Sequence, residues 1–467
     1  MAAVAVVVTV PTVLLTNDSS SDAPETSPAD DIPDGVWTSR GWGYVIDVAD
    51  GEWTWMEETA ISCILVLRQP ADGDSLSQYF GDILLDDDGD VATFTQDPRL
   101  SPIVFDKVDA SQGACANGLT LVAGDAGYVR DPLLDFDVLA KTFDERYASF
   151  ELRGINWDGL TAAACKNLTS NSTDDELVEA FASILLPLDD YHVVLVDEAG
   201  NFLVQSKPWV FAQFKEEFEQ QEDMNISDVD SYQQIQLEKW FQIVGTYMNG
   251  GLNGLPGDLG WGRFNGTGKQ VGYMQVVHLD PEDKDAFTAK LEGAFLSLAD
   301  TESLVLDIRL NRGGYKDLVL LVASHFVSER MLAWTERIVD DDGYTDPFEV
   351  YMEPGSGPTY DGEVIVIISG STVSAGEYVA MTMAQLPQTT LLGRNTAGAT
   401  SGAPDRRLPN GWIFTVSQAE VVSPDGVIYE VVGIPPDILP DADLLPLSER
   451  EAGIDSWLEL ALLMAKQ

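Results

Sequence analysis

A regular alternation of short apolar runs and helix-like segments is the clearest pattern in the second half of this chain. The runs VGYMQVVHL, SLVLDIRL, GEVIVIIS and TTLLG are rich in β-branched residues, which predicts buried strands. Between them lie DKDAFTAKLEGAFLSL, KDLVLLVASHFV and SAGEYVAMTMAQL, whose length and period predict helices. Strands that alternate with helices of this length indicate an α/β layer fold, in which active sites lie in loops beyond the strand ends.

Two different patterns come before this half. Between Val36 and Val129, aromatic and β-branched runs such as GWGYVIDV, WTWMEET and ISCILVLRQ are separated by Asp-Gly turn signals, which predicts a small antiparallel β-domain. From Asp131 the period becomes helical, and the TDDE run predicts an N-cap that leads into an amphipathic helix. The pattern from Phe202 to Leu255 is again mostly helical.

These shifts divide the chain of 467 residues into five predicted segments, as expected for a chain too long to fold around one core. They are a signal-like apolar segment and disordered tether (1–34), an N-terminal β-domain (35–130), a helical region (131–265), an α/β core (266–445) and a C-terminal helix (446–467).

The first residues, MAAVAVVVTVPTVLLT, form an apolar run that is too short for a comfortable transmembrane helix. The run is similar to a signal peptide, although no basic residue precedes it. We therefore expect an exported protein, periplasmic or extracellular, without stable membrane insertion. A cytoplasmic protein with a disordered apolar N-terminus is the alternative.

Composition excludes several classes of partner and cofactor. With 77 acidic and 26 basic side chains, the formal net charge of -51 argues against nucleic acid and anionic membranes. The only cysteines, Cys63, Cys115 and Cys165, have no C-x-x-C spacing, and the three histidines lie far apart in sequence. We expect no metal or other cofactor, and a disulfide between Cys63 and Cys115 is left open.

Two segments of the predicted α/β core carry candidate chemistry. LVLDIRLNRGGY is a strand that runs into an Asn-Arg-Gly-Gly turn, where glycines let backbone N–H groups approach a ligand. In VIVIISGSTVSAGEYVAMTMA a strand ends in small residues and Ser374 opens a helix, which places a hydroxyl and the N–H of Ala375 above the sheet. Taken alone, the glycines also fit an ordinary turn and Ser374 an N-cap, so both readings stay open.

In sequence these segments resemble the carboxy-terminal-processing and tricorn-core serine peptidases. The strand with its Gly-Gly turn, the S-A-x-E segment that begins at Ser374, LLGRNTAGATSG and SPDGVIYEVVGIPPDI match motifs of that family in order. The resemblance implies a crotonase-like core of stacked β-β-α units. It also implies a serine endopeptidase of protein or peptide substrates, with Ser374 as nucleophile and the N–H groups of Gly314 and Ala375 as the oxyanion hole.

The same resemblance bears on the general base. One branch of the family uses a lysine in a G-K-G turn, but the matching turn here is Gly-Ala-Thr (398–400), and no lysine occurs between Lys316 and Lys466. The tricorn-like branch uses a histidine, and LLPLDDYHVVLV has His192 at the D-x-H position of that branch. The resemblance therefore assigns the role of base to His192.

Family resemblance also assigns Glu430, the acid of the closing motif, to a charge relay with this histidine. The serine that precedes the histidine in tricorn is replaced here by Tyr191, and His278 and His325 are less favoured candidates for the base. Because a shared fold does not establish activity, a non-catalytic ligand-binding or scaffold protein on the same fold is the alternative function.

Overall fold

The computed structural model describes residues 32–70, 75–205, 209–220, 226, 228–254, 258–266, 270–340 and 343–466. The predicted signal segment and most of the predicted tether, residues 1–31, lie outside the described residues. Ile32 is buried, with 4% of its surface exposed, and the indole N–H of Trp37 donates to the Pro33 carbonyl at 3.0 Å. The folded chain therefore includes Ile32, upstream of the start expected at Gly35.

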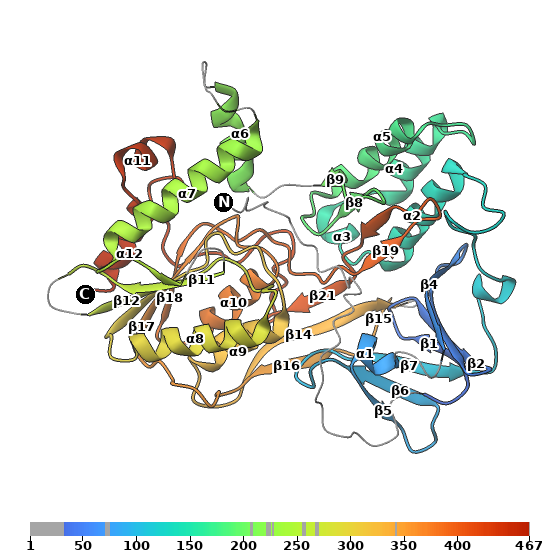
Figure 1. The fold of residues 1–467 in the computed structure, drawn as a ribbon, viewed down its shortest axis with the longest axis horizontal. Coiled ribbons are helices and arrows are strands. Elements are labelled where there is room, and N and C mark those ends of the chain that lie inside the picture. The colour runs from blue at the N-terminus through green and yellow to red at the C-terminus, as the bar shows by residue number, and fades with distance from the viewer. Residues whose placement is uncertain are drawn as a thin grey trace.

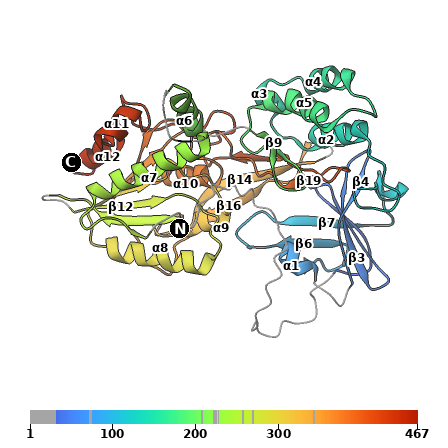
Figure 2. The same cartoon turned by 45° about the horizontal axis from the view of Figure 1, so that its top comes forward.

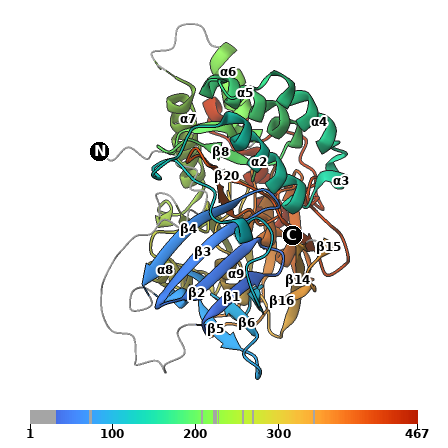
Figure 3. The ribbon, with the colours of Figure 1, turned by 90° about the vertical axis from the view of Figure 1, so that its right-hand side faces the viewer.

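The N-terminal unit is a seven-stranded antiparallel sheet in the order β4-β3-β2-β1-β7-β6-β5 (Figure 1). Large aromatic side chains at alternate strand positions, among them Trp37, Trp53, Phe94 and Phe105, form its core. Its elements are β1 (Gly35–Ser39), β2 (Tyr44–Ala49), β3 (Glu52–Glu58), β4 (Cys63–Pro70), α1 (Leu76–Phe80), β5 (Asp82–Leu85), β6 (Val91–Thr95) and β7 (Ile103–Val108). Figure 3 shows this sheet with the helices of the next unit above it.

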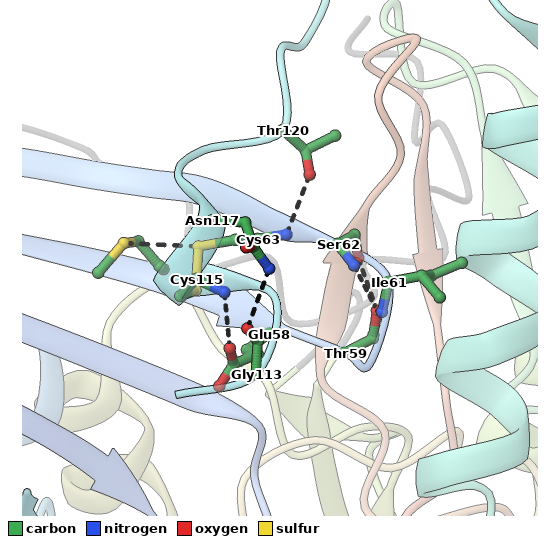
Figure 4. The surroundings of a disulfide bond; sticks show 10 residues. Glu58, Thr59, Ile61, Ser62, Cys63, Gly113, Cys115, Asn117 and Thr120 are labelled. Carbon is green, nitrogen blue, oxygen red and sulfur yellow. Dashed lines mark hydrogen bonds between the residues drawn. A yellow bond between two sulfur atoms is a disulfide. The ribbon is translucent and has the colours of Figure 1, made fainter. Parts of the chain in front are cut away.

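A disulfide between Cys63 and Cys115 fastens the segment that follows β7 to the first residue of β4 (Figure 4). The Glu58 carboxylate accepts the backbone N–H of Cys115 at 2.8 Å, and the Thr120 hydroxyl accepts that of Cys63 at 3.0 Å. Cys165 is free and exposed. The structure thus forms the one pairing that the sequence left open.

A helical unit follows and ends in a small sheet. The capping box predicted by the TDDE run is present, because the Thr173 hydroxyl accepts the Glu176 N–H at 3.2 Å and the Glu176 carboxylate accepts the Thr173 N–H at 2.9 Å. The helices are α2 (Pro132–Arg146), α3 (Phe150–Arg153), α4 (Trp157–Ala164) and α5 (Asp174–Leu185). The small sheet, of order β19-β20-β8-β9, joins β8 (Val194–Val196) and β9 (Phe202–Gln205) to β19 (Asp405–Arg407) and β20 (Ile413–Thr415).

The main sheet has six strands in the order β10-β11-β12-β13-β17-β18, and the last four are parallel. Leu304 and Leu306 of β13 face one core, whereas Val305 between them faces another. Both faces are therefore buried, which explains why these strands are continuous apolar runs. The strands are β10 (Asn253–Gly254), β11 (Leu259–Arg263), β12 (Val271–Val276), β13 (Ser303–Asp307), β17 (Glu363–Ile368) and β18 (Thr389–Gly393).

Helices cover both faces of this sheet (Figure 1). On one face pack α8 (Lys284–Leu298), α9 (Lys316–Ser324) and α10 (Ala375–Ala384). The other face carries α7 (Val229–Tyr247) and α12 (Ser456–Met464), with α6 (Trp209–Gln220) and α11 (Leu447–Ala452) beside them. Over the described ranges, no helix is both long enough and apolar enough to cross a membrane.

A further antiparallel sheet extends from this core towards the N-terminal sheet (Figure 2). Its longest strand, β14 (Met331–Asp340), pairs with β15 (Gly343–Tyr344), β16 (Phe348–Met352) and β21 (Ala419–Val422). At the end of β14, the Asp340 carboxylate accepts the backbone N–H of Gly41 at 3.0 Å. The long strand therefore joins the core to the N-terminal sheet.

Candidate active site

Ser374 has an unusual backbone conformation at the point where β17 leads into α10. Its φ of 54° and ψ of -123° lie in a region that residues other than glycine rarely adopt. Gly313 packs against it so closely that a Cβ on Gly313 would lie 2.7 Å from the Ser374 Cβ. The Asn-Arg-Gly-Gly turn and the serine turn are therefore built against each other, and only glycine fits at position 313.

The backbone N–H of Gly314 points away from Leu279, with which Gly314 forms an isolated parallel bridge. On either side of it, the Leu279 N–H donates to the Gly313 carbonyl and the Tyr315 N–H donates to the Leu279 carbonyl, both at 2.7 Å. In a parallel bridge of this kind the intervening N–H points the other way, and no described residue accepts it. The N–H of Ala375, the first residue of α10, also has no acceptor within its helix.

Asn311 holds the glycine turn and the serine turn together. Its side-chain oxygen accepts the Gly313 N–H at 2.8 Å, and its side-chain amide donates to the Val276 carbonyl at 3.0 Å. Its own carbonyl accepts the Val373 N–H at 2.8 Å. The glycines of this turn were predicted from the sequence as candidate site residues, whereas Asn311, which stands in the same motif, was not.

His192 lies between α5 and β8, and its backbone is fixed on both sides. Its N–H donates to the Asp190 carboxylate at 2.9 Å, and its carbonyl accepts the Thr415 hydroxyl. Burial lowers the pKa of the imidazole below its ordinary value of 6.5, although Asp190 acts in the opposite direction, and the charges of Lys316 and Arg153 lower it further. A neutral imidazole can accept a proton, and no described residue occupies its Nδ1.

Glu430 is buried and accepts hydrogen bonds from three neighbours. One oxygen accepts the backbone N–H groups of Thr400 at 2.7 Å and Ser401 at 2.9 Å, and the other accepts the Arg153 guanidinium at 2.7 Å. Burial and the nearby Asp190 raise the pKa of Glu430, whereas Arg153 lowers it. Among the described residues, no hydrogen bond joins Glu430 to His192, so the expected relay has no direct link.

Glu377 links the serine turn to the glycine-rich segment. Its buried carboxylate accepts the backbone N–H groups of Ser374 at 3.2 Å, and of Gly398 and Ala399 at 2.8 Å each. The Thr396 hydroxyl donates to the same carboxylate at 2.6 Å. Burial raises the pKa of Glu377 to about 7, although these hydrogen bonds lower it.

The other two histidines have different surroundings. His325 stacks on Phe295 with ring centroids 4.0 Å apart, and its Nδ1 lies 2.8 Å from the Pro358 carbonyl, so its ring is a packing element. His278 directly precedes Leu279, and its Nδ1 lies 2.5 Å from the Asp280 carboxylate. Of the two, only His278 lies at the strand end beside the glycine turn.

Unfavourable backbone conformations occur next to several of these candidate residues. Of the five described residues other than glycine with positive φ, three are Asp189, Ser374 and Val431. These precede His192, open α10 and follow Glu430, respectively. Strained backbone of this kind clusters at active sites, where the surrounding structure maintains it. Across the described ranges, no group of histidine, cysteine or acidic side chains is arranged to hold a metal ion.

The site combines a serine at a strained strand-to-helix turn, two backbone N–H groups without an acceptor among the described residues, and a histidine of lowered pKa. Serine hydrolases use components of this kind for acyl transfer. Residues 270–439, which are less than half of the chain, match the sequence model of peptidase family S41. The match confirms the resemblance to the carboxy-terminal-processing peptidases.

Individual proteins are also similar to this chain. The carboxy-terminal-processing protease of Bartonella bacilliformis is 28% identical over 203 residues, which are 43% of this chain and 42% of the relative. A solved protein from Parabacteroides merdae has a TM-score of 0.58 at 21% identity, covering 72% of this chain and 96% of that chain. Mature CPAF in complex with lactacystin has a TM-score of 0.51 at 13% identity, covering 72% and 97%. The chain thus spans less than half of the first relative, and the solved structures show a common α/β fold.

Proposed function

We propose that this protein is a serine endopeptidase that hydrolyses peptide bonds through an acyl-enzyme, with Ser374 as the nucleophile and His192 as the general base. The observation that carries the proposal is the strained Ser374, packed against Gly313 and next to the unpaired N–H of Gly314. Neither strain nor an unpaired N–H group is needed by a serine that only caps a helix.

In the proposed mechanism, His192 takes the proton of the Ser374 hydroxyl as its oxygen attacks the carbonyl carbon of a peptide bond. The N–H groups of Gly314 and Ala375 donate to the negative oxygen of the tetrahedral intermediate. His192 then returns the proton to the leaving amine, and water, activated in the same way, hydrolyses the acyl-enzyme. Glu430 acts on the imidazolium through its negative charge and through the segment that it holds, without touching the ring.

The finer architecture and the location belong to the same proposal. We assign the α/β half to a crotonase-like core of β-β-α units, preceded by the N-terminal β-domain and the helical region. The Cys63–Cys115 disulfide supports an exported protein, because disulfides persist in oxidising compartments such as the periplasm and the extracellular space. The substrates are proteins or peptides, as the family match suggests.

A fluorophosphonate probe tests this function directly, because it labels only an activated serine. Wild-type protein should be labelled at Ser374, and Ser374→Ala should not be labelled at all. Cleavage of a peptide library should disappear in the same variant. A folded wild-type protein that takes up no label and cleaves no peptide would instead be a non-catalytic protein on this fold.

A further inference from the structure

Arg153, the last residue of α3, lies buried where the helical unit meets the α/β core. Only 6% of its side chain is exposed. One guanidinium nitrogen donates to the carbonyl oxygens of Leu188 at 2.8 Å and Asp189 at 2.6 Å. Another donates to the Glu430 carboxylate at 2.7 Å and lies 3.5 Å from the Asp190 carboxylate. One side chain thus binds the segment before His192 and the closing motif, which are far apart in sequence.

A continuous set of hydrogen bonds leads from the serine turn to this arginine. The segment Gly398–Ser401 gives its first two N–H groups to Glu377, which also holds the Ser374 N–H. Its last two N–H groups go to Glu430, which holds Arg153. The two buried glutamates therefore bind the two ends of one short segment.

Beyond Arg153, its ion pair with Asp190 leads on to the proposed base. Asp190 accepts the backbone N–H of His192 and the hydroxyl of Tyr147, both at 2.9 Å. Within the described part of the chain, Arg153 is the only basic side chain that forms an ion pair with Glu430 or with Asp190. Removal of its charge would leave two buried carboxylates without a cation, a strongly unfavourable arrangement.

We propose that Arg153 is a positioning residue for this reaction: by clamping residues 188–190 to Glu430, it holds His192 at the working distance from Ser374. The inference rests on the proposed function, since it gives a role to a residue that touches neither the nucleophile nor the substrate. It differs from a purely structural role because the clamp joins the segment of the base to Glu430. Glu430 binds the segment 398–401, which Glu377 in turn connects to the serine turn.

The clamp also sets the charges around the base. Charged or titratable groups that act on Glu430 or on His192 are Asp190, Arg153, Glu377, Tyr147, Tyr378 and Lys316. Loss of the arginine charge removes one of the cations that lower the pKa of His192 and the one that lowers the pKa of Glu430. Both groups then hold a proton to higher pH, so the acid limb of the activity profile moves upward.

The test uses the full-length protein and three variants. Arg153→Met has a side chain of similar length without the charge. Arg153→Lys keeps the charge but lacks the planar set of N–H donors of the guanidinium group. Arg130→Met, which removes a half-exposed arginine of the same unit, is the matched control. For each variant we would measure the melting temperature, the rate of fluorophosphonate labelling at Ser374, and kcat and KM for a cleaved peptide against pH.

We expect Arg153→Met to fold, to lose about 100-fold in labelling rate and in kcat, and to show an acid limb at higher pH with KM little changed, because a displacement of about 1 Å has such effects on catalysis. Arg153→Lys should recover part of the rate and return the acid limb towards that of wild type. Arg130→Met should match wild type.

Equal labelling rates and equal pH profiles in folded Arg153→Met and wild type would overturn the inference and leave the proposed function intact. If Arg153→Met does not fold, Arg153→Lys decides: a folded lysine variant as fast as wild type overturns the inference, and a slower one with unchanged KM supports it. A wild-type protein that takes up no label overturns the proposed function itself.

Discussion

The backbone N–H of Ser374 donates to the carboxylate of Glu377 at 3.2 Å, one helical turn further along α10. The same carboxylate accepts the N–H groups of Gly398 and Ala399 at 2.8 Å each. One buried acid therefore holds both the nucleophile turn and the glycine-rich segment. This gives a physical reason for the S-A-x-E spacing, because an acceptor at the third position of the helix reaches back to the N–H of the N-cap residue.

Gly313→Ala should abolish most labelling of Ser374. Gly313 has a φ of 101°, and a Cβ there would lie 2.7 Å from the Ser374 Cβ, so the serine turn must shift. The matched control is Gly293→Ala in α8, where a Cβ meets no atom within 4 Å; it should stabilise the protein by up to about 1 kcal/mol and leave labelling unchanged. Labelling rates and urea unfolding of both variants provide the measurement, and full labelling of Gly313→Ala would contradict the contact.

Strands and helices with a clear pattern of hydrophobic residues could be predicted from the sequence. The strand ending in small residues and the helix opened by Ser374 are confirmed as β17 and α10, and SLVLDIRL contains β13. These elements are recognisable because burial on both sheet faces demands continuous apolar runs. The antiparallel β14, β16 and β21, by contrast, were not predicted, since charged residues interrupt the apolar run of β14 and its partner β21 lies far along the chain.

The candidate site was predictable only where a local motif marks it. Ser374 and the Gly-Gly turn stand in such motifs, and His192 and Glu430 were named by resemblance. Arg153 was missed because its partner Glu430 lies 277 residues away and no local pattern announces a pairing between them. Long-range polar contacts of this kind depend on how helices and loops pack, which hydrophobic periodicity does not specify.

Salt should stabilise this protein. A net charge of -51 on one chain produces repulsion among carboxylates that opposes the compact state. Added salt shortens the reach of that repulsion, to about 3 Å in molar salt. The melting temperature should therefore rise steadily between dilute buffer and molar NaCl, as followed by circular dichroism. A flat or falling curve would show that the excess acidic charge is not a strain on the fold.

Asp135 should make the stability depend on pH. Burial raises its pKa to about 6, from an ordinary value of 3.8, although the Asn410 N–H acts in the opposite direction. Because the folded-state pKa is the higher one, the contribution of Asp135 to stability is complete below 3.8 and is lost as the pH rises through about 6. Between about pH 4 and about pH 8, the free energy of unfolding should fall by about 1–3 kcal/mol more in wild type than in Asp135→Asn.

The control for that measurement is Asp144→Asn, which changes an exposed carboxylate on the same helix, α2. Its free energy of unfolding should follow that of wild type across the same range. Urea unfolding could show that the free energies of unfolding of wild type and Asp135→Asn depend on pH in the same way. That result would mean that folding does not raise the pKa of Asp135.

The histidine-based mechanism makes an ordered set of kinetic predictions. Ser374→Ala and His192→Ala should each remove most peptidase activity, and the double variant should be little worse than either, because residues that act as one unit are strongly non-additive.

In wild type, kcat/KM should fall on the acid side at a pH below 6.5, because burial lowers the pKa of His192. Lys316→Met should move this acid limb to higher pH, since the Lys316 charge lowers the same pKa, and should leave the plateau rate nearly unchanged. Lys215→Met, at an exposed lysine of α6, is the control and should leave the acid limb at the wild-type pH.

If His192→Ala kept the wild-type rate while Ser374→Ala was inactive, the base would be another group, and His278, beside the glycine turn, would be tested next.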